Sequence, residues 1–281
     1  NNYLNYYPGD EYVQMIGVTG YNTGTYYAGL GETWRSFEKI YDAIEKAYKP
    51  FYGDFPWIIT EFASSSIGGD KAAWVRRMFA ELPDYENIKL AVWFSSADYE
   101  MRDGEKVAAR PYFMDETPEI TEEIAEAAKD IAIAESHNTS KAVNLVYELL
   151  RTITDILGKE SDIDIIDMHD NKKLDAPSGT AKVMGRIIAE ELGVDWNEKA
   201  VFGREGKGIR GENEITYHSL RSGNISSSHT VVFGMDGERL ELTHHSYDFG
   251  TFAKGALDCI LFLKDKQPGM YTSQEAFGLA K

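Results

Sequence analysis

The sequence is poor in cysteine, in positive charge and in long apolar runs. Its 281 residues include one cysteine, Cys259, so no disulfide can form within the chain, and the apolar segment "ALDCILFL" predicts a buried small hydrophobe there. Twenty-nine basic residues stand against 46 acidic ones, and the net charge of −17 would repel the phosphates of a nucleic acid. Because no apolar run reaches the roughly eighteen residues of a membrane span, no such span is expected.

Aromatic residues and histidines are divided unevenly along the chain. Four of the five tryptophans precede residue 113, whereas all six histidines follow residue 136. A change this sharp predicts two domains, which we place at residues 1–125 and 126–281. The acidic, helix-prone stretch 115–136 carries the boundary.

The first half alternates apolar strands with amphipathic helices, which is typical of a parallel sheet. Strands are expected at 12–22, 55–63 and 88–96, and helices at 33–48 (with Thr33 as N-cap) and 68–82. Tyr21, Glu61 and Trp93 then fall at or near the strand ends, where a β/α barrel holds its chemistry. Packing at a barrel mouth explains Tyr21 and Trp93 equally well, but burying the acid of Glu61 is costly unless it is used.

"YYPGDEYVQMIGVTGYN", "WIITEFASS", "GGDKAAW" and "LAVWF" follow in order along the first half. Together they resemble glycoside hydrolase family 26, the barrels of β-mannanases and mixed-linkage glucanases. The resemblance implies the C-terminal part of a (β/α)8 barrel, with Glu61 as nucleophile, Tyr21 bound to it and Trp93 stacked on a sugar. Glycoside hydrolysis needs two carboxyl groups. The family's acid/base glutamate has no counterpart here, so no hydrolysis is expected.

The second half predicts an α+β domain with a mixed open sheet. Helices are expected at 141–158, 178–193 and 251–266, the second capped by Ser178 and ended by Gly193. Strands are expected at 162–170, 215–223, 227–234 and 238–246.

The stretch "MHDNKKLDAPSGTA" (168–181) gathers a histidine, cations and the start of a helix. His169 ends a strand, and a histidine near its natural pKa can deliver a proton. The open amides of Ser178, Gly179 and Thr180 suit a carboxylate. These residues predict a pocket for a small dicarboxylate, although a structural histidine and an ordinary helix start remain the alternatives.

This stretch and "AVFGREG", "HSLRSGNISSSHTVVF", "GERLELTH" and "TFAKGALDCILFL" resemble the C-terminal domain of dihydrodipicolinate reductase. The resemblance implies that His169 is the acid/base and Lys173 the second active-site residue. It also implies that Asp170, Ser178, Gly179 and Thr180 contact the substrate. Asp170 replaces the family's second histidine, and Phe249 stands where an arginine is common.

The complete reductases use NAD(P)H, but no Gly-rich phosphate loop occurs here, so no cofactor-binding residues are assigned. No metal is expected, because the histidines and acids lack ligand spacing. The remaining histidines (His218, His229, His244, His245) are interpreted as core or interface residues.

Three functions stay open for the whole chain, which has the pattern of two joined fragments. It is a reductase substrate domain that binds a dicarboxylate heterocycle, a glycosidase fragment that binds β-glycan, or a non-catalytic assembly module. The resemblance implies a homo-tetramer through the C-terminal sheet. The reductase half is expected in the cytoplasm, whereas the glycosidase half is typical of secreted proteins, and no signal peptide is evident.

Overall fold

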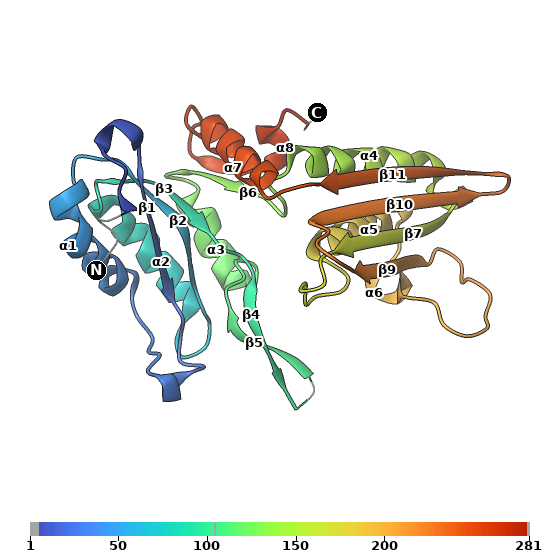
Figure 1. The fold of residues 1–281 in the computed structure, drawn as a ribbon, viewed down its shortest axis with the longest axis horizontal. Helices are drawn as coiled ribbons and strands as arrows, with labels where there is room; N and C mark the ends of the chain where they lie inside the picture. The colour runs from blue at the N-terminus through green and yellow to red at the C-terminus, as the bar shows by residue number, and fades with distance from the viewer. Residues whose placement is uncertain (1–5, 104, 280–281) are drawn as a thin grey trace. The chain divides into compact units, whose positions relative to one another are not determined.

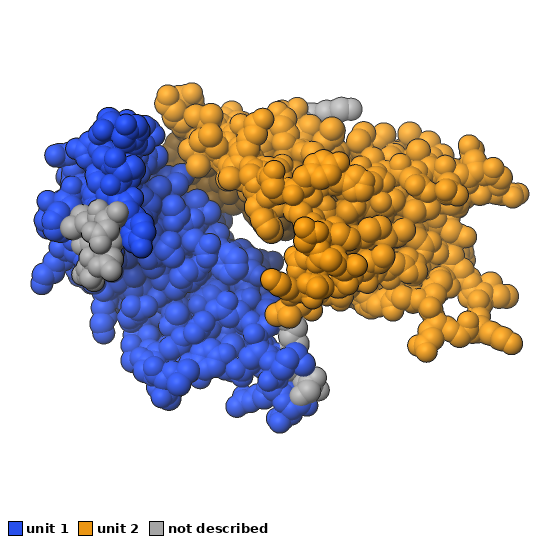
Figure 2. Space-filling view, in the orientation of Figure 1, with its two compact units in different colours: residues 1–130 blue, residues 131–281 orange. Residues whose placement is uncertain are grey.

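The computed structural model describes residues 6–103 and 105–279. The chain divides into two compact units, residues 1–130 and residues 131–281, which Figure 2 colours separately. Each unit is described below by itself. Within the described residues, none of the helices combines the length and apolar character that crossing a membrane requires.

Unit 1 is built on a parallel three-stranded sheet. Its strands β1 (Ile16–Asn22), β2 (Trp57–Ser64) and β3 (Ile88–Trp93) lie in the order β1-β2-β3. Helix α1 (Phe37–Tyr52) joins the first two strands, and α2 (Lys71–Glu81) joins the second to the third. This alternation confirms the strands and helices expected from the apolar pattern of the first half.

Helix α1 begins later than the sequence predicted. Ser36 is the N-cap, since its hydroxyl accepts a hydrogen bond from the Lys39 amide, and the prediction of Thr33 as N-cap is wrong. Phe37, Ile40 and Tyr41 form the buried stripe of this helix. Starting the helix at Phe37 lets that ring stack on Tyr41 with the ring centroids 4.3 Å apart.

The rest of unit 1 does not continue the strand–helix alternation. Strands β4 (Ala97–Arg102) and β5 (Glu105–Pro111) form an antiparallel hairpin of their own, which the sequence did not predict. Helix α3 (Pro118–Ala127) follows and packs against α2. The described residues of unit 1 therefore show a three-stranded sheet and a hairpin, and they do not show the expected part of a (β/α)8 barrel.

Unit 2 is an α/β structure around a mixed five-stranded sheet in the order β11-β10-β7-β9-β8 (Figure 1). Its elements in chain order are β6 (Ala132–Glu135), α4 (Lys141–Leu157), β7 (Asp162–His169), α5 (Gly179–Leu192), α6 (Trp196–Lys199), β8 (Ala200–Phe202), β9 (Ile215–Arg221), β10 (Ser227–Met235), β11 (Glu238–Ser246), α7 (Gly250–Leu263), β12 (Gly269–Thr272) and α8 (Ser273–Ala276). The expected mixed open sheet is confirmed. The sequence did not predict β6 and β12, which pair in parallel with each other.

One face of this sheet is the floor of the hydrophobic core. Register aligns Leu242, Val231, Ile165 and Tyr217 across β11, β10, β7 and β9, and the next aligned row is also apolar. Helices α4 and α5 lie against this face, where Leu150 and Ile188 are fully buried (Figure 1). Burying these rows fixes the register of the sheet, because a shift by one residue would turn every apolar side chain outward.

Side chains fix the ends of the core helices. Ser140 caps α4 by accepting the Val143 amide, and Ser178 caps α5 by accepting the Ala181 amide. Gly193 ends α5 with a φ of 69°, a left-handed conformation that glycine adopts without strain. Both ends of α5 were predicted correctly, so its N-terminus has a defined position at the carboxyl end of β7.

Candidate functional site

Polar residues replace apolar ones at one end of the core face of unit 2. Register places His244, His229, Asp167 and Ser219 side by side on β11, β10, β7 and β9, and we call these four residues the polar row. Asp167 and His229 are 1% and 2% exposed, which is unusual for groups that can carry charge. Burying such groups costs free energy unless they are paired, so the polar row marks a functional site.

Asp167 is the charged centre of the site. Its carboxylate accepts hydrogen bonds from the Ser178 amide at 2.6 Å and from Arg221 Nη1 at 2.5 Å. Burial opposes its ionisation, but these bonds and the neighbouring His169 outweigh burial and hold the pKa of Asp167 below its usual value. Asp167 is therefore an anion that neutralises the cations around it.

His169 ends β7 beside this anion and is 8% exposed. Its Nδ1 lies 3.5 Å from Asp167 Oδ1, an ion-pair distance at which no hydrogen bond of ordinary geometry forms. The ring is therefore oriented by Asp167 through Nδ1, which leaves Nε2 as the nitrogen for a ligand. This geometry suits a residue that holds a proton and releases it to a bound molecule.

His229 packs edge-on against His169, with ring centroids 5.3 Å apart. Burial is the main cause that lowers the pKa of His229 to about 3, and the neighbouring His169 acts in the same direction, whereas Asp167 opposes it. His229 is thus neutral at physiological pH.

Two groups of Ser178, its backbone amide and its hydroxyl, attach the N-terminus of α5 to the sheet. Asp167 accepts the backbone amide of Ser178, and His229 Nε2 lies 2.9 Å from the Ser178 hydroxyl. That hydroxyl also accepts the Ala181 amide. Within the described part of the chain, the amides of Gly179 and Thr180 have no hydrogen-bond partner. Two adjacent free amides at a helix N-terminus form an anion-binding position.

The position that a Gly179 side chain would occupy is open. A Cβ placed on Gly179 would meet no atom within 4 Å. Thr180 faces the start of α4, where its hydroxyl accepts a hydrogen bond from Asn138 at 3.1 Å. The helix start is therefore open at Gly179 and supported at Thr180.

Lys173 and Asp170 lie in the turn that follows β7. Lys173 Nζ pairs with Asp175 at 2.8 Å, and its side chain keeps 28% of its surface exposed. The Asp170 carboxylate accepts the Lys172 amide at 2.7 Å, so it stabilises the turn. This hydrogen bond gives Asp170 a local structural role in place of the histidine that the family usually has there.

The structure places His169 and Ser178 around the same carboxylate, that of Asp167, which takes up the Ser178 amide that the sequence predicted to be open. It also adds residues that the sequence analysis left out. His229 was interpreted as a core or interface residue, and Asp167 and Arg221 were not singled out. The sequence pattern could have indicated two of them. Asp167 lies at the spacing of two from the buried residues of β7, and His229 lies at the same spacing from those of β10, so the pattern would point both toward the core.

Unit 1 places two of its predicted site residues in contact. The Tyr21 hydroxyl donates a hydrogen bond to the Glu61 carboxylate across β1 and β2. Burial and this bond raise the pKa of Tyr21. Trp93 ends β3, but its indole nitrogen donates to the Tyr112 carbonyl at 2.8 Å and its ring packs against Phe62. Trp93 is therefore partly committed to packing.

The starts of α1 and α2 do not suit a dinucleotide phosphate. In dinucleotide-binding folds a short Gly-rich turn leads from a strand into free helix amides. Here residues 23–36 separate β1 from α1, and Ser36 caps that helix. The Asp70 carboxylate caps α2 by accepting the Ala73 amide, and its charge would repel a phosphate.

Among residues 6–103 and 105–279, no cluster of side chains is arranged to hold a metal ion.

Comparison with known proteins finds a match within the second unit. Residues 142–277 match the family described as "Dihydrodipicolinate reductase, C-terminus". One relative is the 4-hydroxy-tetrahydrodipicolinate reductase of Akkermansia muciniphila, 43% identical over 161 residues. That match covers 57% of this chain and 65% of the relative, so the chain spans less than two thirds of the relative's length.

A solved structure shares the fold more broadly. The dipicolinate-bound dihydrodipicolinate reductase from Paenisporosarcina sp. TG-14 superposes with a TM-score of 0.52 at 17% identity. The superposition covers 95% of this chain and 90% of that one. At this identity the likeness shows the fold alone, an α/β fold with a mixed sheet. The comparisons match the second-half resemblance, and they do not show the glycoside hydrolase fragment expected in the first half.

Proposed function

We propose that unit 2 binds a small dicarboxylate and is the substrate domain of a 4-hydroxy-tetrahydrodipicolinate reductase, an NAD(P)H-dependent enzyme of lysine and diaminopimelate biosynthesis. The observation that carries the proposal is the position of His169 beside the start of α5, where Asp167 and His229 hold Ser178 and the amides of Gly179 and Thr180 stay free. Lys173 lies in the turn between β7 and this helix start. A cation on one side and a helix N-terminus on the other match the two charges of a dicarboxylate.

Each residue has a defined part in the proposed reaction. The amides of Gly179 and Thr180 bind one carboxylate, and the ammonium group of Lys173 attracts the other. Protonated His169, oriented by Asp167, delivers a proton to the heterocycle through Nε2. In the reductase family NAD(P)H supplies the hydride, but the starts of α1 and α2 do not fit its phosphates, so the proposal covers binding and proton delivery only.

The ligand contact at Gly179 offers a clean test. Gly179→Ala adds a methyl group that meets no protein atom, so stability should be unchanged while a ligand carboxylate is kept away from the amides. Titration calorimetry with pyridine-2,6-dicarboxylate should show binding that weakens about tenfold or more, since losing hydrogen bonds to a charged group costs roughly 1.5–3 kcal/mol. Gly208→Ala, also in open space, is the matched control. Equal affinity of the two variants for pyridine-2,6-dicarboxylate would show that the N-terminus of α5 does not bind the ligand.

A second candidate function belongs to unit 1, and the Tyr21–Glu61 hydrogen bond favours it. We propose that residues 1–125 derive from a family 26 glycosidase and bind β-glycan without hydrolysing it. A tyrosine that donates to a carboxylate orients that carboxylate, as a nucleophile requires. Electrophoresis through gels containing β-mannan or mixed-linkage glucan should show retardation that Glu61→Gln reduces. Release of sugar by the wild-type chain would instead mean that a second carboxyl group takes part.

We also propose that unit 2 forms a homo-tetramer through the sheet face opposite α4 and α5. That face carries Ile166, Met168 and the 44% exposed Leu220 in neighbouring positions. Two such faces can pack against each other as layers of a sheet sandwich. Light scattering coupled to size-exclusion chromatography should report four chains, and Leu220→Asp should give smaller species. A strict monomer would exclude both the tetramer and the alternative of a non-catalytic assembly module.

A further inference from the structure

A cavity lies in unit 2, apart from the polar row. It has a volume of about 460 Å³ and lies between helices α4 and α5, bordered by the start of α8. Tyr147, Ile187 and Ser273 line it and are each less than a tenth exposed. A cavity of this size, with a buried floor, can hold a molecule of metabolite dimensions.

The two helices present opposite charges to each other across this cavity. Arg151 of α4 pairs with Glu190 of α5 at 2.9 Å and closes one end. One turn nearer the helix N-termini, Glu148 on α4 and Arg186 on α5 both line the cavity. Within the described residues no ion pair joins Glu148 to Arg186, so an acid and a base face the cavity without neutralising each other.

Arg186 is held in this position by an aromatic ring. Its guanidinium lies over Trp196 at 5.1 Å from the ring centroid, a cation–π contact that leaves its N–H groups available at the edges. The indole of Trp196 is itself fixed by a 2.8 Å hydrogen bond to the Tyr217 hydroxyl. The positive group is therefore positioned before any ligand arrives.

The floor of the cavity supplies a further polar group. Tyr147 is 2% exposed, and within the described residues its hydroxyl makes no hydrogen bond of ordinary geometry. Burial raises the pKa of Tyr147, although the neighbouring Thr180 hydroxyl acts in the opposite direction. A buried hydroxyl without a partner costs free energy, which a ligand acceptor would recover.

We propose that this cavity binds a small zwitterion, with its ammonium group on Glu148 and its carboxylate on Arg186 and the Tyr147 hydroxyl. Glu135 also lines the cavity, and with Glu148 it gives the entrance an acidic excess that disfavours a dianion. The ligand class thus differs from the dicarboxylate proposed for the α5 N-terminus. The inference does not rest on that function.

The test compares three probes of equal length on the full chain. Titration calorimetry should show that 6-aminohexanoate binds about tenfold or more tightly than hexylamine or hexanoate, because each control loses one charged contact. Glu148→Gln and Arg186→Gln should each reduce the affinity for 6-aminohexanoate to that of the corresponding single-charge probe. Glu241→Gln, on exposed β11 outside the cavity, should bind as the wild type does.

Several results would overturn the proposal. Equal affinities for the three probes, or unchanged binding in both cavity variants, would show that the opposed charges are not a recognition site. A thermal unfolding midpoint equal to that of the wild type is expected for Glu148→Gln, whereas Arg186→Gln should unfold at a slightly lower temperature because it loses the contact with Trp196. Tighter binding of pyridine-2,6-dicarboxylate than of 6-aminohexanoate to the Gly179→Ala variant would assign the cavity to a dianion instead.

Discussion

The Nε2 atom of His229 lies 2.9 Å from the Ser178 hydroxyl, although 51 residues separate them in the chain. Asp167, the register partner of His229, accepts the amide of the same serine. Two side chains of one sheet row therefore fix both polar groups of one helix cap. This arrangement sets the distance between the free amides of α5 and the ring of His169.

The contact between His229 and Ser178 should be measurable as a coupling free energy. Ser178→Ala should cost about 1 kcal/mol for the lost cap, and His229→Phe should cost a similar amount. The double variant should lose less than the two single losses combined, by about 0.5 kcal/mol or more, because both single changes remove the same hydrogen bond. Urea unfolding of the four proteins provides the values.

Ser140→Ala is the control for this cycle, because Ser140 caps α4 in the same manner without a histidine on its hydroxyl. The loss of unfolding free energy in the Ser140→Ala/His229→Phe double variant should equal the sum of the two single losses. Strict additivity in both cycles would mean that His229 and Ser178 are neighbours without an energetic link.

The neutral state of His229 should make stability depend on pH. Its pKa is near 3 in the folded chain and about 6.5 when unfolded, so the unfolded chain binds more protons between these values. The free energy of unfolding should therefore fall as the pH drops from about 6.5, by up to about 1.4 kcal/mol per pH unit. His229→Phe should flatten this dependence, and His218→Phe, on the other sheet face, should not. An unchanged slope in His229→Phe would contradict the buried neutral state.

Asp167 should make the free energy of unfolding depend on pH in a more acidic range than His229 does. Because its pKa in the folded chain is depressed, the ionised carboxylate stabilises the fold above the unfolded pKa of about 3.8. That contribution should be lost as the pH falls further, toward the lower folded pKa. Asp167→Asn should be less stable than the wild type at neutral pH, and the difference should shrink below about pH 4. Urea unfolding at several pH values tests this, with the exposed Asp236→Asn as control; a constant difference would exclude the ionised pair with Arg221.

Gly185 marks a close approach between α5 and the sheet. A Cβ at this position would lie 1.6 Å from the Tyr217 hydroxyl, which the Trp196 indole already holds in place. Gly185→Ala should therefore destabilise unit 2 by about 1–3 kcal/mol, despite alanine's higher helix propensity. Thermal unfolding of Gly185→Ala and Gly208→Ala makes the comparison, since the second substitution meets open space. Equal unfolding midpoints of the two variants would mean that α5 and the sheet accommodate the added methyl group without loss of stability.

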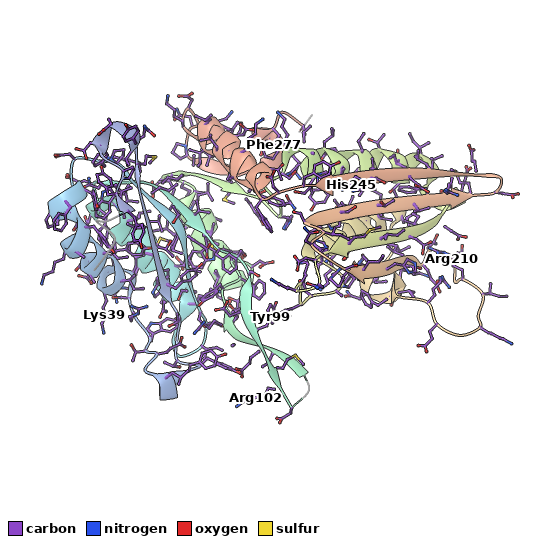
Figure 3. All side chains as sticks on the ribbon, in the orientation of Figure 1. Lys39, Tyr99, Arg102, Arg210, His245 and Phe277 are labelled. Atoms are coloured by element: carbon purple, nitrogen blue, oxygen red, sulfur yellow. The ribbon has the colours of Figure 1, made fainter. Side chains whose placement is uncertain are left out.

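A surface ion-pair cluster shows how much of the sheet the sequence could reveal. The strand that the sequence predicted at 238–246 is confirmed as β11. No local pattern predicted that Arg210, labelled in Figure 3, reaches Asp162 at 3.1 Å and Asp164 at 2.8 Å. Such a contact depends on which strands become neighbours, and the chain's local pattern carries little information about that.

The sequence by itself determined the local elements of unit 2 and the beginning and end of α5. Ser178 and Gly193 act through hydrogen bonds and backbone angles within a few residues, so their effect is legible along the chain. His169 and Lys173 were predicted as site residues from one short stretch and the family that it resembles. Only the tertiary structure selected His229, Asp167 and the cavity with Glu148 and Arg186. Their roles follow from cross-strand register and helix packing, which bring distant residues into contact and bury them there.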